Sequence, residues 1–205
     1  MIIINTDFLM DNKEGLTIVI PALNEPYLPK LYSDIETICD KLNIEYEVLV
    51  ETIKGCGNAI LKGISESRYK YVLVMDADGS HSPLYIINMW NMINRENYDL
   101  IYGRKGLSND SLFRKIVTKI FGFIARIFVR DYPDLMSGFF IFDKTKINPL
   151  PDKIDHPKVL LYIVKHNKNI KIDYINIIFY KRKGGKSKLG KPSIALSIIK
   201  EIMLR

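Results

Sequence analysis

Two acidic residues, Asp76 and Asp78, stand two positions apart directly after the apolar run Tyr71–Met75. If that run is a buried strand, both carboxylates lie beyond its carboxyl end and can face one ligand. Such hard oxygen ligands suit Mg²⁺ or Mn²⁺, and either ion can bridge the oxygens of a diphosphate. Aspartates are common in loops, so it is the position after an apolar strand that favours a metal-diphosphate site.

Two further polar segments could meet that pair. Pro21–Glu25 follows the apolar run Leu16–Ile20, and strand ends of a parallel sheet lie at one edge. Near the C-terminus, Lys181–Lys191 is a basic loop that contains glycines. Its cations could neutralise a phosphorylated ligand, and the alternative is a basic loop that only contacts solvent.

The elements that would position these residues alternate in the first half of the chain. We expect strands at 16–20, 46–50, 71–75 and 98–102, and helices at 26–42, 57–67 and 83–94. In the second half we expect helices at 112–130, 156–166 and from Pro192 to the C-terminus, and strands at 137–142 and 172–180. This order predicts an α/β fold with a mostly parallel central sheet and helices on both faces, in one domain over residues 1–205.

The expected helix 112–130 has a wide apolar and aromatic side and a basic arc. The basic arc holds lysines, arginines and a threonine: Arg114, Lys115, Thr118, Lys119, Arg126 and Arg130. This pattern is typical of a helix that lies in a membrane surface, although a buried core helix would also be apolar. The expected C-terminal helix, 192–205, is a second candidate for such an interfacial helix.

Composition limits the compartment and the partners. The net charge is +7, from 30 basic and 23 acidic residues, and favours an anionic partner. No interleaved aromatic and basic motif supports nucleic-acid binding. Cys39 and Cys56 form no metal-binding pair. We expect no signal peptide or membrane-spanning helix, and therefore a cytoplasmic protein at the cytoplasmic face of a membrane.

Five segments together carry a resemblance to a known family. They occur in the family's order: Ile18–Glu25, Gly55–Ala59 with Gly63, Val74–His81, Asp134–Phe139, and Arg182 with Gly185–Leu189. The chain resembles the inverting family-2 glycosyltransferases of GT-A fold, in particular the branch similar to dolichol-phosphate mannose synthases. The resemblance implies transfer of a sugar from a nucleotide-sugar donor, either GDP-mannose or a UDP-sugar, to a polyprenyl phosphate at a membrane surface.

The resemblance also assigns roles on the donor side. Pro21, Leu23 and Glu25 would line the nucleotide pocket. Asp76 and Asp78 would hold Mg²⁺ or Mn²⁺ with the diphosphate, and Ser80 stands where the family often has a glutamine ligand. The basic loop would close over the donor phosphates through three residues: Arg182, Ser187 and Lys188. With Asp78, the loop's Arg182 and Lys188 would stabilise the departing nucleoside diphosphate.

On the acceptor side, Arg104, Arg114 and Thr118 resemble the family's site for the acceptor phosphate. Asp134 would position the acceptor, or act as a base if the acceptor is a hydroxyl. Two alternatives remain. One is a glycosyltransferase for a sugar hydroxyl, whose usual (E/Q/R)xxRW-like motif is missing here. The other is a catalytically inactive protein that binds a nucleotide sugar.

One segment departs from the family. The second strand normally ends in paired aspartates and a loop that holds the base and ribose. Here the chain continues from Val50 through Glu51 to Gly55, and that loop is largely missing. Glu51 could replace the missing carboxylate, so we expect it in the nucleotide site, while the choice between guanine and uracil stays open.

Overall fold

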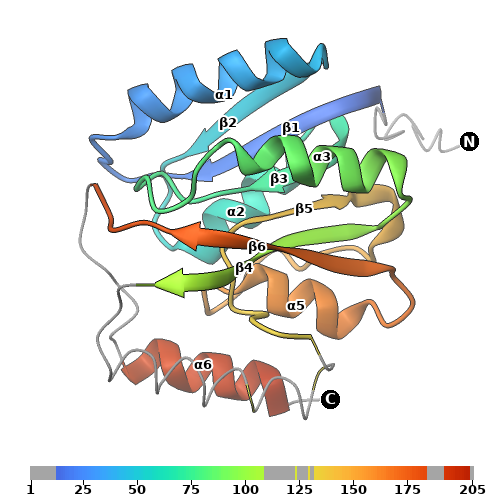
Figure 1. Ribbon diagram of the computed structural model, residues 1–205. Helices are drawn as coiled ribbons and strands as arrows, with labels where there is room; N and C mark the ends of the chain where they lie inside the picture. Colours follow the sequence, from blue (N-terminus) through green and yellow to red (C-terminus); the bar gives the residue numbers. More distant parts are fainter. Residues whose placement is uncertain (1–12, 109–122, 124–128, 130–131, 184–191, 204–205) are drawn as a thin grey trace, which may run out of the picture.

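The computed structural model describes residues 13–108, 123, 129, 132–183 and 192–203, and its centre is one six-stranded sheet. The strands are β1 (Lys13–Pro21), β2 (Tyr46–Glu51), β3 (Tyr69–Val74), β4 (Leu100–Ser108), β5 (Phe140–Asp143) and β6 (Ile172–Phe179). The helices are α1 (Leu28–Leu42), α2 (Cys56–Ser65), α3 (Tyr85–Arg95), α5 (Val159–His166) and α6 (Pro192–Met203), with a 3-10 turn at Lys144–Lys146. Figure 1 shows the helices on both sides of this sheet.

The strand order is β2-β1-β3-β5-β4-β6, and β5 alone runs antiparallel to its neighbours. β1 pairs in parallel with β2 and β3, with Pro21 opposite Glu51 and Val19 opposite Val74. This register brings the carboxyl ends of three neighbouring strands to one edge of the sheet. The polar segments that follow β1, β2 and β3 are therefore neighbours in space.

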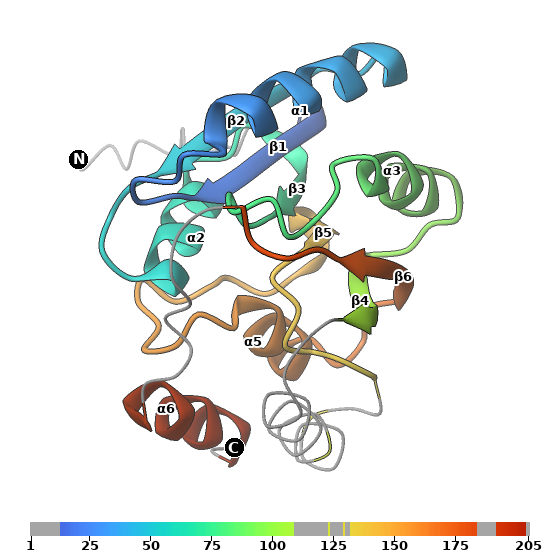
Figure 2. The ribbon, with the colours of Figure 1, turned by 60° about the vertical axis from the view of Figure 1, so that its left-hand side comes forward.

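Each face of the sheet has its own apolar core. On one face α1 and α3 pack on alternate side chains of β1 and β3, and the helices contribute Leu31, Ile35 and Trp90 to this core. On the other face α2 and α5 pack against the sheet, and α6 lies outside α5, as Figure 2 shows. The strands that pack against both layers are apolar at successive positions, as expected for a sheet covered on both sides.

The predicted fold class is confirmed: the structure is an α/β sheet, mostly parallel, with helices on both faces. Every predicted element within the described residues is present, with ends shifted by a few residues. The largest difference is β4, which continues to Ser108 because it pairs with β6 well beyond Tyr102, from Gly103 opposite Ile175 to Lys105 opposite Ile177. Through this longer pairing with β6, β4 continues past its predicted end at Tyr102.

The two expected interfacial helices have different outcomes. Apart from Phe123 and Val129, the segment 112–130 lies outside the described residues. Helix α6 is described, and its Ile198 and Ile202 are buried in the core beside α5. Its Leu196 and Met203 are exposed, at 68% and 60%. Within the described part of the chain, no helix combines the length and apolar character needed to span a bilayer.

Candidate functional site

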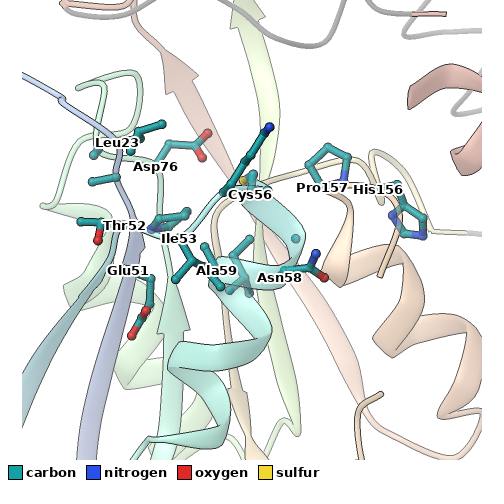
Figure 3. A pocket seen from close by; sticks show the side chains of 18 of the residues that line it. Leu23, Glu51, Thr52, Ile53, Cys56, Asn58, Ala59, Asp76, His156 and Pro157 are labelled. Carbon is teal, nitrogen blue, oxygen red and sulfur yellow. The ribbon is translucent and has the colours of Figure 1, made fainter. Parts of the chain in front are cut away.

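A pocket of about 720 Å³ opens at the strand-end edge of the sheet. The ends of β1, β2 and β3 form one wall, and the first turn of α2 with residues 154–158 forms the opposite wall. In Figure 3 Leu23, Asp76 and Ile53 lie on the strand side, and His156 and Pro157 lie across from them. The predicted donor-site residues in the pocket lining are Pro21, Leu23, Glu25, Glu51, Asp76, Asp78 and Arg182.

Asp78 is almost completely buried, with 2% of its surface exposed. Its Oδ1 accepts a hydrogen bond of 2.9 Å from the amide of Ser80, and the left-handed φ of +73° at Gly79 makes this tight turn possible. A side chain at Gly79 would also collide with the ring of Tyr27. The turn therefore fixes the Asp78 carboxylate against the pocket instead of leaving it on a mobile loop.

Asp76 lies beside the segment that leads into β5. A Cβ atom at Gly138 would come within 3.1 Å of its Oδ2, so the glycine leaves space for this carboxylate. Gly138 belongs to the Asp134–Phe139 segment, which crosses the strand ends just before β5. The structure thus places two motifs that are 60 residues apart in direct contact at the pocket.

Arg182, which lies near the C-terminal end of the sequence, contacts the carboxylate of Asp78. Its Nη1 lies 3.0 Å from Asp78 Oδ2. The backbone after β6 runs along the aspartate turn, because Tyr180 N donates to Ser80 O and Lys183 N donates to Asp78 O. The cation predicted to hold the donor phosphates is therefore anchored by main-chain hydrogen bonds next to the two aspartates.

The donor set fits a divalent ion that is shared with a ligand. Asp76 and Asp78 supply two carboxylates, and the buried Oε2 of Glu25 and Oγ of Ser80 have no hydrogen-bond partner within the part of the chain that the structure describes. No group of three or more His, Cys, Asp or Glu ligands exists among the described residues. Such an ion would need further oxygens from water and from a diphosphate, which is ordinary for Mg²⁺.

Ser80 contributes to the site in a different way from the two aspartates. It is completely buried and is not part of the pocket lining. Next to it, the ring of His81 stacks on Phe139 and meets Phe179 edge-on. Burial lowers the pKa of His81, so the ring is neutral at neutral pH and supports the turn by packing. Whether Ser80 completes a metal shell stays a prediction.

Glu51 ends β2, and its carboxylate points away from Asp76 in Figure 3. It is 6% exposed, and its Oε2 accepts a hydrogen bond of 2.8 Å from Nζ of Lys62. The role of Glu51 as an acceptor for a base or ribose stays a prediction. In the structure, its Oε2 is already paired with Lys62. Leu23 and Ile53, by contrast, are 49% and 41% exposed on the same wall.

The second wall depends on a close approach of two backbones. A Cβ atom at Gly57 would lie 2.2 Å from the carbonyl oxygen of His156, so α2 can pack here only with a glycine. Asn58 Oδ1 accepts a hydrogen bond of 2.8 Å from the amide of Ile154. Lys158 Nζ donates to Met136 O at 2.6 Å, which joins this wall to the Asp134–Phe139 segment.

Arg104 lies in β4, and neither it nor Asp134 is part of the pocket lining. Asp134 has a left-handed φ of +57°, and its Oδ2 accepts a hydrogen bond of 2.9 Å from Lys105 N. Burial raises the pKa of this carboxyl, although the Lys105 amide and the nearby charges of Lys158 and Arg104 act in the opposite direction. The guanidinium of Arg104 lies over the ring of Tyr174. The structure therefore brings two predicted acceptor residues together.

Four predicted site residues lie outside the described residues. They are Arg114, Thr118, Ser187 and Lys188. Two residues that sequence reasoning did not assign to the site are Asn58 and Lys158, both in the pocket lining. Asn58 lies in the glycine motif at 55–59, so the sequence had indicated this segment but not this residue. Lys158 had no signal of its own, because one lysine before an apolar helix resembles an ordinary surface residue.

Comparison with known proteins shows which family this chain is similar to. The model of the family described as glycosyl transferase family 2 matches residues 33–167, more than half of the chain. A dolichol-phosphate mannosyltransferase from Pyrococcus furiosus is 29% identical over 212 aligned positions, which cover 85% of this chain. The match covers 59% of that relative, so the chain spans less than two thirds of its length.

Solved structures share the fold at low sequence identity. A glucosyl-3-phosphoglycerate synthase from Mycobacterium tuberculosis, solved with Mn²⁺, UDP and phosphoglyceric acid, gives a TM-score of 0.70 at 14% identity, covering 94% of this chain and 80% of that one. A mannosyl-3-phosphoglycerate synthase from Rubrobacter xylanophilus gives a TM-score of 0.65 at 11% identity, covering 92% and 73%. These likenesses show the fold, and the family match shows the membership: the chain belongs to glycosyltransferase family 2.

Proposed function

We propose that this protein transfers a sugar from a nucleotide-sugar donor to a polyprenyl phosphate, with inversion at the anomeric carbon. The observation that carries the proposal is the cluster of Asp76, Asp78 and Arg182 at one end of a pocket of about 720 Å³. Two carboxylates with an adjacent guanidinium suit a metal-bound diphosphate. The similarity to a dolichol-phosphate mannosyltransferase supports a polyprenyl-phosphate acceptor.

On the donor side, Asp76 and Asp78 would hold Mg²⁺ or Mn²⁺, which supplies Lewis-acid stabilisation of the diphosphate when bound. Arg182 would neutralise the charge that develops on the departing nucleoside diphosphate. Its anchoring beside the Asp78 turn keeps the guanidinium in position before the reaction, so little reorganisation is needed. From the loop that follows, Ser187 and Lys188 would add further donors to the phosphates.

On the acceptor side, a phosphate monoester has a second pKa of about 6 and is already ionised at neutral pH. A strong general base is then unnecessary, and the task of the protein is to position the nucleophile. Arg104 would hold the acceptor phosphate together with Arg114 and Thr118. Asp134, fixed by the Lys105 amide, would orient this group of donors or the acceptor itself.

The experiment is a transfer assay with GDP-mannose and UDP-glucose as donors, undecaprenyl or dolichyl phosphate as acceptor, and Mn²⁺. We expect a glycosyl phosphoryl lipid, detected by mass spectrometry, and no product when the metal is chelated. 3-Phosphoglycerate serves as a soluble phosphate acceptor and a hydroxylated sugar as a neutral one. Product from the neutral acceptor alone would establish the hydroxyl-acceptor alternative instead. Binding of nucleotide sugars without any turnover would show an inactive binding protein.

A further inference from the structure

Among the described residues, the side chains on the pocket wall at the end of β2 are Glu51, Thr52, Ile53 and Lys54. Glu51 is the nearest carboxylate on this wall, and Lys62 already occupies it at 2.8 Å. The packing behind it is tight, since a Cβ atom at Gly63 would lie 3.3 Å from Glu51 Cγ. The carboxylate is thus held between the strand and α2, turned from the pocket, as Figure 3 shows.

The other polar side chains of the pocket do not require one particular base. On the opposite wall, Asn58 Oδ1 accepts a hydrogen bond from the amide of Ile154. Thr52 carries a hydroxyl that can both donate and accept, and Lys54 can only donate. Guanine and uracil both offer carbonyl acceptors to such groups, and adenine offers ring nitrogens. None of these side chains therefore requires one particular base.

The apolar groups on the wall are suited to the face of a base. Leu23 and Ile53 are large, exposed and part of the pocket lining. Contact with the face of a flat ring depends on its area, and every base has such a face. A site that reads hydrogen bonds rejects a mismatched ligand by about 10⁴-fold or more, whereas apolar contacts discriminate by about 10–200-fold.

From these contacts we infer that the donor site accepts purine and pyrimidine nucleoside diphosphates with similar affinity, because the Glu51–Lys62 ion pair removes the carboxylate that would select a base. This inference rests on the proposed function, since it concerns the donor of that reaction. The protein would then recognise its donor through the diphosphate, at Asp76 and Asp78, and through the sugar.

The test is isothermal titration of the protein with GDP, UDP and ADP in the presence of Mn²⁺. The expected dissociation constants fall within about tenfold of one another, since apolar contacts alone separate ligands weakly. A preference beyond about tenfold for one base would overturn the inference and leave the proposed function intact. Failure of all three to bind would overturn both.

Two variants test the cause. Glu51→Gln should leave the ratios between the three dissociation constants within about threefold of the wild-type ratios, because the carboxylate contacts Lys62 and not the base. Selective weakening of one nucleotide by Glu51→Gln would contradict the inference. Leu23→Ala should weaken all three by a similar factor, because it removes contact with the face that the bases share. Loss confined to one nucleotide would contradict the inference as well.

Discussion

Asp134 combines a left-handed backbone with a partly buried carboxyl group, and each feature has an energetic cost. Its φ is +57°, a conformation that aspartate and asparagine adopt more readily than most residues. The Lys105 amide and the fold of the 134–139 segment hold it there; Tyr102 hydroxyl donates to Pro133 O just before it. A residue placed at such a cost next to the acceptor side is better explained by catalysis than by stability.

We therefore expect Asp134→Asn to stabilise the protein at pH 7 and to lower sugar transfer at least tenfold. Burial raises the pKa of Asp134 in the folded protein above its ordinary value of 3.8. The stabilising contribution of the protonated form is complete below the unfolded pKa and is lost as pH rises through the folded pKa. Asparagine keeps an oxygen for the Lys105 amide and carries no charge.

Calorimetric melting temperatures across pH check this expectation. The gain of Asp134→Asn over the wild type should be largest near neutrality and should shrink as the pH falls toward 3.8. The exposed Asp152→Asn is the matched control and should show no such trend. A variant that melts lower than the wild type at pH 7 would show that the ionised carboxylate stabilises the fold.

The sequence predicted those pocket-lining residues that stand in short motifs, and it did not predict the contacts that depend on long-range packing. The positions of Asp76, Asp78 and Arg182 follow from strand ends and from the family's motifs. The pairing of Glu51 with Lys62 does not, because it depends on how α2 turns against β2 after a shortened connection. No local pattern around either residue specifies that angle.

At the scale of elements, α6 is fastened to α5 by a cluster around Glu201. Lys165 and His166 contact its carboxylate, and buried His156 lies 3.8 Å away. Burial tends to raise the pKa of Glu201, but the contacts with these three side chains outweigh it and lower the pKa to about 2. Since residues 154–158 line the pocket, this cluster also supports the second wall.

We expect Glu201→Gln to lower the free energy of unfolding by about 1–2 kcal/mol, between the values for exposed and buried ion pairs. The pKa of Glu201 in the folded protein lies below its ordinary value of 4.5, so the stabilising contribution of the carboxylate is present above pH 4.5 and is lost as the pH falls toward 2. Urea denaturation at pH 7 and pH 3 measures the loss of unfolding free energy and its dependence on pH. Glu14→Gln, which breaks an exposed pair with Lys70, should cost less. Equal effects of both variants would contradict the role of the cluster.

The contact between α2 and the 154–158 segment gives a second prediction for an element. Gly57→Ala places a methyl group within 2.2 Å of the His156 carbonyl and must move one backbone. We expect a loss of about 1–3 kcal/mol in stability and weaker nucleotide binding, because the second wall moves. Gly106→Ala, where the new atom meets its nearest neighbour at 3.4 Å, is the control. Unchanged nucleotide affinity in a folded Gly57→Ala protein would show that this wall does not contribute to binding.

The elements themselves were predictable because their apolar periods are simple. Strands such as β3 are apolar at successive positions, and helices such as α1 have one buried stripe, Leu31, Ile35 and Ile38. The direction of β5 was not predictable in this way. It is only four residues long and follows a turn-rich segment, so its antiparallel insertion between β3 and β4 is decided by the whole sheet.

At the scale of the whole molecule, the net charge of +7 and the exposed apolar residues of α6 support our proposal of peripheral contact with an anionic membrane. We expect Leu196→Ser with Met203→Ser to reduce flotation with phosphatidylglycerol vesicles several-fold, because apolar area that would enter the interface is lost. Leu84→Ser, which removes an equally exposed leucine before α3, should have little effect. If both proteins float like the wild type, α6 is not the contact.

The account depends most on the assignment of Asp76 and Asp78 to a metal-bound diphosphate. The direct measurement is titration of wild-type protein and Asp78→Asn with UDP and GDP, each with and without Mn²⁺, after circular dichroism has shown that both are folded. We predict that Mn²⁺ tightens nucleotide binding to the wild type at least tenfold and has no such effect on the variant, while Asp152→Asn behaves like the wild type. Equal metal dependence in Asp78→Asn and the wild type would contradict the central claim.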